Sequence, residues 1–350
     1  MKKKNLSVKK KIHNFYSKKL EDPRIKKIYL NFKKKISSHV PNSFCVAVSG
    51  GVDSMALSFL AKCYSIENNK KVYFYIVDHK IRKNSTFEAN LVKKKLKSFQ
   101  ILSKILTIKK ENISKNIQSF ARENRYKLII KQSLIKKIDM ILTAHHFDDL
   151  IENFFIRLLR GSGLKGLISF SKIKSKLKLN HKVFILRPLI DIPKKDLLYL
   201  SKNTFNYNVK DPSNLDDKFL RVKVRKLISN LEKEGLTFNK FKLSLNNLNK
   251  SNNAIEYYVQ KNINNNSKYL KLAKKVILKD EFLKQPDEIV FRSLSEVIQK
   301  VGKKDTFARG AKVENLIKQL RSKNNYSKKT LSGCIIQKLE NSVIISQENR

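Results

Sequence analysis

The sequence contains little cysteine, proline or glycine, and each shortage excludes something. Only three cysteines occur in 350 residues, at Cys45, Cys63 and Cys334, far apart and without a C-x-x-C pair. This usage argues against a structural zinc site or a four-cysteine cluster and fits a reducing cytoplasm. Six prolines and nine glycines argue against a long disordered linker.

Long hydrophobic runs are also missing. The chain has no stretch of about 18 uncharged apolar residues, the length that a membrane-spanning helix needs. Its amino terminus lacks the apolar core of a signal peptide. We therefore expect a cytoplasmic protein with no membrane partner.

Acidic residues are scarce as well. There are 29 Asp and Glu against 76 Lys and Arg, so the formal net charge is +47. A charge this large indicates a polyanionic partner, and nucleic acid is the natural candidate. Lys, Asn and Ile are all abundant, as an AT-rich genome would produce, so compositional drift accounts for part of the excess. The 41% hydrophobic content is sufficient for real cores, and the length suits two domains.

The most informative stretch is a short glycine-containing loop at residues 49–54. It follows an apolar run at 44–48 and precedes a helical apolar pattern at 55–64, so it leads from a buried strand into a helix. Phosphates bind at such places, because free N–H groups and the helix dipole favour an anion. The predicted ATP-binding residues are Ser49, Gly50, Gly51, Val52, Asp53 and Ser54.

Asp53 is the unusual member of this loop. A carboxylate beside a phosphate repels it unless a cation lies between them, so Asp53 predicts Mg²⁺. No Lys follows the glycines, which excludes a Walker A loop, and a dinucleotide fingerprint would need three spaced glycines. The alternative interpretation is an ordinary strand-to-helix turn capped by a serine.

A second stretch, residues 143–153, begins at a strand end and continues into a helix. On that helix His145, Asp149 and Glu152 would share one face. Clustered carboxylates are tolerable around a cation, either Mg²⁺ or a substrate ammonium. His146 is a candidate acid, base or phosphate contact. Zinc fits less well, because no His-x₃-His pair accompanies the cluster. The alternative is a charged helix start whose aspartates favour the helix dipole.

The remaining pattern predicts the architecture. Strands at 44–48, 72–77, 101–108 and 139–143 alternate with helices, which predicts an α/β fold whose mostly parallel sheet has helices on both faces. We expect three parts: a basic N-terminal extension over 1–40, a catalytic domain over 41–225, and a helical C-terminal domain over 226–350. The last part should end in a small β element, a hairpin with its turn near Glu340 and Asn341.

Several arginines are candidate ligands for an anion. Arg122 lies on a predicted helix at 118–130, Arg157 and Arg160 precede a glycine-rich turn, and Arg221 and Arg225 alternate with apolar residues.

Taken together, these pieces resemble the bacterial tRNA(Ile)-lysidine synthases of the ATP pyrophosphatase superfamily. The resemblance covers roughly residues 44–225. It includes the loop at 49–54, the run Val77 to Arg82, the Ala144-His145-His146-x-Asp148-Asp149-x-x-Glu152 stretch, Arg187-Pro188-Leu189, and Asp211-x-Ser213-Asn214-x-Asp216. Two positions depart from the family pattern: Asn153 stands where Thr is usual, and Val222 where Asn is common. We expect the third domain of longer members to be absent.

The resemblance implies an adenine nucleotide alpha-hydrolase-like fold and a two-step ligation. ATP would adenylate the C2 oxygen of the wobble cytidine in a CAU anticodon of tRNA(Ile), and the ε-amino group of free lysine would displace AMP. Asp149 and Glu152 would bind lysine. His146, Asp149 and Arg122 would be catalytic. Arg157, Arg160, Arg221 and Arg225 would contact tRNA, and Asp53 would hold Mg²⁺. Family members are often homodimers.

The sequence allows three alternative interpretations. A tRNA thiolase of the same superfamily would need paired catalytic cysteines or an iron–sulfur cluster, and amidating relatives need an ammonia source. A basic RNA-binding protein with a vestigial nucleotide fold would form no ATP-dependent product.

Overall fold

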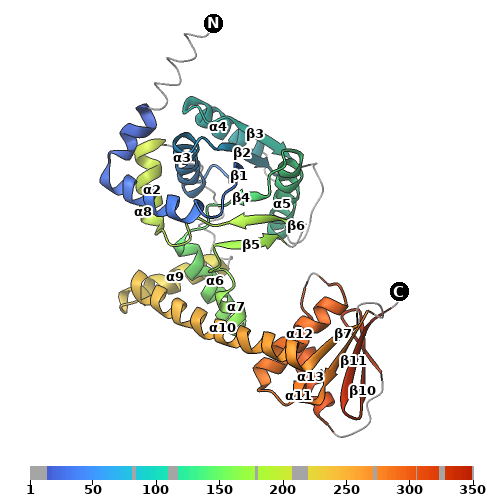
Figure 1. The fold of residues 1–350 in the computed structure, drawn as a ribbon. Helices are drawn as coiled ribbons and strands as arrows, with labels where there is room; N and C mark the ends of the chain where they lie inside the picture. Colours follow the sequence, from blue (N-terminus) through green and yellow to red (C-terminus); the bar gives the residue numbers. More distant parts are fainter. Residues whose placement is uncertain are drawn as a thin grey trace. The chain divides into compact units, whose positions relative to one another are not determined.

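The computed structural model describes residues 14–80, 84–108, 117–177, 180–206, 220–270, 274–304, 306–322 and 328–348. Contacts between residues divide the chain into two compact units, Met1–Phe241 and Lys242–Arg350. The division falls within a long helix, α10 (Phe238–Asn266), rather than at the predicted position after residue 225. The chain path and labels are shown in Figure 1.

The first unit is built on a six-stranded sheet with the order β3-β2-β1-β4-β6-β5. The pairs β3–β2, β2–β1, β1–β4 and β4–β6 are parallel, whereas β5 runs antiparallel to β6. The strands are β1 (Ser43–Val48), β2 (Lys71–Asp78), β3 (Ser103–Thr107), β4 (Met140–Leu142), β5 (Lys174–Leu177) and β6 (Asn180–Leu186). The predicted mostly parallel sheet is thereby confirmed.

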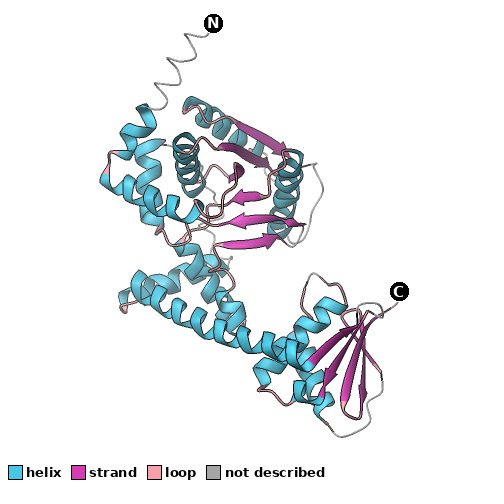
Figure 2. Cartoon of the chain, in the orientation of Figure 1, coloured by secondary structure: helices cyan, strands magenta, loops and turns pink. Residues whose placement is uncertain are grey.

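Helices cover both faces of this sheet, as Figure 2 shows. The helices of this unit are α2 (Pro23–Ile36), α3 (Val52–Glu67), α4 (Ser85–Ser98), α5 (Ile117–Ile135), α6 (Phe147–Leu158), α7 (Leu164–Ile168), α8 (Lys194–Thr204) and α9 (Leu220–Lys233), of which α2, α3, α4, α5 and α8 supply the cores against the sheet. One core gathers side chains of α2, α3, α4 and α8 against one face of the strands. A second core packs α5 against the other face. Strands buried on both faces are the reason that β1 and β2 read as continuous apolar runs.

The helix α2 packs within the first core, although its sequence reads as a basic arm. Asp22 caps it through its side chain, which accepts from the N–H groups of Arg24 and Ile25 at 2.8 and 3.0 Å. Its buried side chains are Ile25, Ile28, Tyr29, Phe32 and Ile36. The lysines of α2 lie between these apolar positions, so charge masks a helix that has a core-facing side.

The second unit combines helices with a five-stranded antiparallel sheet of order β7-β8-β11-β10-β9. Its elements are α10, β7 (Ser267–Leu270), β8 (Lys275–Lys279), α11 (Asp280–Leu283), α12 (Asp287–Val301), α13 (Gly310–Arg321), β9 (Lys329–Leu331), β10 (Cys334–Leu339) and β11 (Ser342–Gln347). The predicted hairpin is β10 and β11, joined at Glu340 and Asn341. Three further strands complete the sheet, so the terminal β element is larger than a hairpin.

Within the described ranges, no helix is long and apolar enough to cross a membrane.

We predict that Phe32→Ala destabilises the first unit, because Phe32 is fully buried while its neighbour Leu30 is 52% exposed. Truncating a buried phenylalanine costs about 3–5 kcal/mol through lost burial and the cavity left behind. Leu30→Ala is the matched control and should cost under about 0.5 kcal/mol. Urea unfolding measures the free energy of unfolding of both variants. Equally small losses of this free energy would show that α2 is not part of the core.

Candidate functional site

The site lies where β1 and β4 end side by side. These strands are parallel neighbours, and residues 49–54 follow β1 while His145 and His146 follow β4. The chain leaves β1 toward β2 and β3, then returns to β4 on the other side of β1. Open α/β sheets bind their ligands at such a switch point, beyond the carboxyl ends of the strands.

The loop after β1 is organised by Ser54. Its Oγ accepts from the N–H groups of Ser49 and Gly50, both at 3.1 Å, and donates to the carbonyl of Gly51 at 2.9 Å. Ser54 is 4% exposed, so its hydroxyl serves the loop itself. Gly50 has φ 86°, a conformation that favours glycine.

The start of α3 is left open to an anion. Gly51 is the N-cap residue and supplies no side-chain cap, and Val52 and Asp53 are the first helical residues. Uncapped N–H groups of a first helical turn point outward along the helix axis, and the helix dipole adds partial positive charge there. The predicted phosphate loop therefore has the backbone geometry that phosphate binding requires.

His146 joins this loop to α6. Its Nε2 lies 3.5 Å from Oδ2 of Asp53 and 3.6 Å from Oδ2 of Asp149, and its Nδ1 lies 3.5 Å from Oδ2 of Asp148. The ring is 3% exposed. The backbone N–H of His146 also donates to Asp149 at 3.2 Å. One imidazole is thus surrounded by three carboxylates from two different elements.

These carboxylates decide the charge of the ring. Burial alone would lower the pKa of His146, but Asp148, Asp53 and Asp149 together raise it to about 10. His146 is therefore an imidazolium at neutral pH. Burial works to raise the pKa of Asp148, yet the bonds with His146 and with the N–H of Lys194 hold it below its usual value. The group of four keeps a net negative charge.

Asp53 has the properties expected of a Mg²⁺ ligand. Its Oδ1 is buried and has no hydrogen-bond partner among the described residues. The same part of the chain contains no group of three or more His, Cys, Asp or Glu side chains arranged to hold a metal by themselves. Mg²⁺ at nucleotide sites commonly uses one or two carboxylates, with phosphate oxygens and water completing the shell, so one carboxylate is sufficient.

One expected feature of the second stretch is wrong. His145 does not share a helix face with Asp149 and Glu152, because α6 begins at Phe147 and the N-cap His146 is extended. His145 lies before the helix, where its Nδ1 is 2.8 Å from the hydroxyl of Thr143. Its ring also meets Phe170 edge to face, with centroids 5.2 Å apart. Spacing alone could not locate the start of the helix.

Glu152 lies on α6 as predicted, but its charge is already paired. The Nε of Arg225 donates to its Oε1 at 2.5 Å, and the second guanidinium contact is 3.4 Å long. The Glu152 side chain is 5% exposed and that of Arg225 35%. Burial would lower the pKa of Arg225, but Glu152, Asp149 and Asp53 raise it. From the sequence we expected Glu152 to bind lysine and Arg225 to contact tRNA. In the structure these two side chains form an ion pair with each other.

The other predicted arginines fall into two sets. Arg122 lies over the ring of Tyr126, 5.5 Å from its centroid, and Arg122 and Arg221 are both close enough to His145 to influence its pKa. Arg157 is the eleventh residue of α6, roughly 15 Å along the helix from its start, and Arg160 follows the helix. Arg122 and Arg221 thus act on the charge of His145, whereas Arg157 and Arg160 lie toward and beyond the far end of α6.

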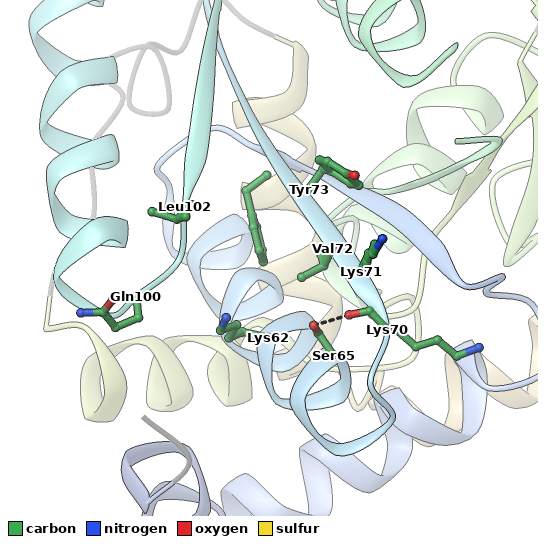
Figure 3. Close-up of a pocket in the computed structure, with 9 residues that line it drawn as sticks. Lys62, Ser65, Lys70, Lys71, Val72, Tyr73, Gln100 and Leu102 are labelled. Carbon is green, nitrogen blue, oxygen red and sulfur yellow. Dashed lines mark hydrogen bonds between the residues drawn. The ribbon is translucent and has the colours of Figure 1, made fainter. Parts of the chain in front are cut away.

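Two parts of the sequence pattern lie outside the described residues: Ile81 with Arg82, and the loop from Asp211 to Asp216. The described chain also has a pocket of about 300 Å³, shown in Figure 3, lined by Lys62, Ser65, Lys70, Lys71, Val72, Tyr73, Phe74, Gln100 and Leu102. It lies where β2 begins, at the edge of the sheet opposite the phosphate loop. Nothing connects it with the chemistry of the site.

Comparison with known proteins defines the class first. Residues 22–232 match the model of the PP-loop domain family. The tRNA(Ile)-lysidine synthase of Orientia tsutsugamushi is 32% identical over 317 residues, covering 87% of this chain and 69% of the relative. That of Rickettsia typhi is 30% identical over 330 residues, covering 92% and 74%. The chain belongs to the tRNA(Ile)-lysidine synthase family.

A solved structure agrees on the fold. The U34-tRNA thiolase NcsA from Methanococcus maripaludis, solved with its 4Fe-4S cluster, matches with a TM-score of 0.53 and 22% identity, over 64% of this chain and 79% of that one. Cys45 and Cys63 are buried within the two cores of the first unit, and Cys334 is buried in the second unit. Burial raises the pKa of all three thiols, so none is prepared as a thiolate.

We predict a pH signature for His146. A raised folded-state pKa means that the imidazolium stabilises the fold below the ordinary histidine pKa, near 6.5, and that this contribution is lost as pH rises toward about 10. The difference in unfolding free energy between the wild type and His146→Asn should therefore shrink between these values. A difference that stays constant across the window would mean that the ring is neutral.

Proposed function

We propose that this protein ligates L-lysine to C2 of the wobble cytidine in the CAU anticodon of tRNA(Ile), consuming ATP and releasing AMP and pyrophosphate. The product, lysidine, would change codon reading from AUG to AUA. The observation that carries this proposal is the phosphate loop joined through His146 to two carboxylates of α6, in a chain of this family. The use of lysine as a substrate, the binding of tRNA(Ile) and a homodimeric state are parts of this proposal.

In the first step, the C2 oxygen of cytidine attacks the α-phosphorus of ATP, and the bond to pyrophosphate breaks. The N–H groups at the start of α3 hold the phosphates that leave. Mg²⁺ bound at Asp53 would neutralise the charge that develops on the pyrophosphate. His146 carries a positive charge rather than a free lone pair, so it stabilises phosphate oxygens and does not act as a general base.

In the second step, the ε-ammonium of lysine gives one proton to Asp149, its nitrogen attacks C2, and the C2–O bond to the adenylate breaks with release of AMP. Asp149 is the better placed of the two predicted lysine ligands, because its Oδ2 faces the same region as the Nε2 of His146, 3.6 Å away. Glu152 can meet an ammonium only in competition with Arg225. The ε-ammonium would thus enter between Asp149 and Glu152 and share or displace the guanidinium.

The tRNA would be held by phosphate contacts over the basic surface. Arg157 and Arg160 lie beyond the reacting centre, which suits contacts to the RNA backbone, and Arg221 and Arg225 lie on α9 near it. Binding through phosphates releases counterions, so the affinity for tRNA should fall steeply with salt.

We predict that Asp149→Asn raises the KM for lysine about tenfold or more, while pyrophosphate release driven by tRNA survives, because only the second step uses the carboxylate for binding. Glu152→Gln should raise it less, since Arg225 already neutralises that side chain. Glu123→Gln, an exposed pair with Lys127 on α5, is the matched control. Unchanged lysine kinetics in Asp149→Asn would remove this residue from the lysine site.

The adenylation step tests the proposal against a non-catalytic RNA-binding protein. Purified protein with ATP, Mg²⁺ and tRNA(Ile) bearing CAU should release pyrophosphate in the absence of lysine. The same tRNA with uridine at the wobble position should release none above background. Tight binding of both RNAs with no pyrophosphate from either would favour the binding-protein alternative.

A further inference from the structure

Arg187, just after β6, is a buried arginine with no acidic partner among the residues that the structure describes. It is 9% exposed. One guanidinium nitrogen donates to the carbonyl of Lys172 and to the hydroxyl of Ser175, both at 3.0 Å, and the group lies over the ring of Phe170 at 5.0 Å. Its Nε is buried and has no hydrogen-bond partner within the described ranges. None of these contacts carries a negative charge.

Arg292 in the second unit is a buried arginine that does have acidic partners, although one of its nitrogens is also without a hydrogen bond among the described residues. It is 4% exposed and contacts Glu288 at 2.7 Å and Glu256 at 3.2 Å. The amide oxygen of Asn252 lies 2.7 Å from the same guanidinium. A buried charge without such compensation is strongly unfavourable, so an unpaired one points to a counter-ion supplied by a ligand.

The surroundings of Arg187 increase the positive charge instead of compensating it. Burial first, and then the charges of Arg187, Arg122 and Arg221, lower the pKa of His145 well below its usual value, so that its ring is neutral. Arg125 donates from two nitrogens to Nε2 of His79, at 3.2 and 2.9 Å. No carboxylate is among the groups that act on Arg125 or Arg187.

The site is therefore divided by charge. Asp53, Asp148 and Asp149 gather around His146 at the ends of β1 and β4, while the arginines gather around His145 and beyond the ends of β2 and β6. The acidic half suits a divalent cation with pyrophosphate. In the cationic half, the buried carboxylate of Asp78 at the end of β2 is held by Ser85, Thr86 and Lys80, so it does not neutralise Arg187.

We propose that Arg187, together with Arg122 and Arg221, forms a subsite for a phosphate group that is separate from the phosphate loop. The proposal rests on the proposed function, because it assigns a second anion to that site. Two sources share this chemistry: a backbone phosphate of the tRNA next to the wobble nucleotide, and the phosphate of the adenylate. Planar, multiply donating guanidinium groups suit either.

The test is direct binding without turnover. Arg187→Gln, Arg187→Lys and the exposed neighbour Lys172→Gln as matched control are compared with the wild type by fluorescence anisotropy of labelled full-length tRNA over a salt series. ATP and AMP binding are measured by calorimetry. Arg187→Gln should lower the binding affinity for one of these ligands about tenfold. Arg187→Lys should lower it less, and Lys172→Gln should change it little.

Loss of tRNA affinity with a shallower salt slope assigns the subsite to the RNA backbone, and loss of AMP affinity assigns it to the adenylate. Unchanged binding of both, or an effect confined to the KM for lysine, overturns the proposal. Arg122→Gln repeats the binding test at an exposed position. The proposal can therefore still be tested if substitution of the buried Arg187 prevents folding. Binding does not require lysidine formation, so the subsite and the proposed ligation can fail independently.

Discussion

The contact between a positively charged His146 and the carboxylates around it is the interaction on which the site depends. It spans two elements that are distant in sequence, because Asp53 belongs to the first turn of α3 while Asp148 and Asp149 belong to the first turn of α6. Parallel pairing of β1 with β4 brings these two ends together. A neutral histidine would leave several buried or half-buried carboxylates to repel one another, so the ring's proton is part of the architecture.

This arrangement separates two tasks that would otherwise interfere. Adenylation needs positive charge near phosphates, and capture of lysine needs negative charge near an ammonium. In the proposed reaction, backbone N–H groups and an imidazolium would serve the first task and α6 carboxylates the second, within one edge of the sheet. The pairing of Glu152 with Arg225 keeps one of those carboxylates compensated before substrates arrive. The arginines around His145 extend the positive side of the site.

Much of this was readable in the sequence, because it lies in local patterns. The strand, loop and helix at residues 43–67, the parallel sheet, and the terminal hairpin follow from apolar runs and turn residues. What failed depended on tertiary context. The start of α6 at Phe147 follows from an extended His146 that spacing does not reveal, and α2 was hidden by its lysines. Arg187 was seen only as part of Arg-Pro-Leu, since its burial without an acidic partner is a property of the folded chain. The strands β7 and β8 were missed because a short strand after a long helix resembles its continuation.

The central claim is that one site adenylates a cytidine and then joins lysine to it. Its most direct test is mass spectrometry of nucleosides from tRNA(Ile) incubated with the protein, ATP, Mg²⁺ and isotopically labelled lysine. The account predicts a labelled nucleoside in place of the wobble cytidine, absent when that cytidine is changed to uridine and absent without ATP. An unmodified wobble cytidine from a folded, tRNA-binding protein would contradict it.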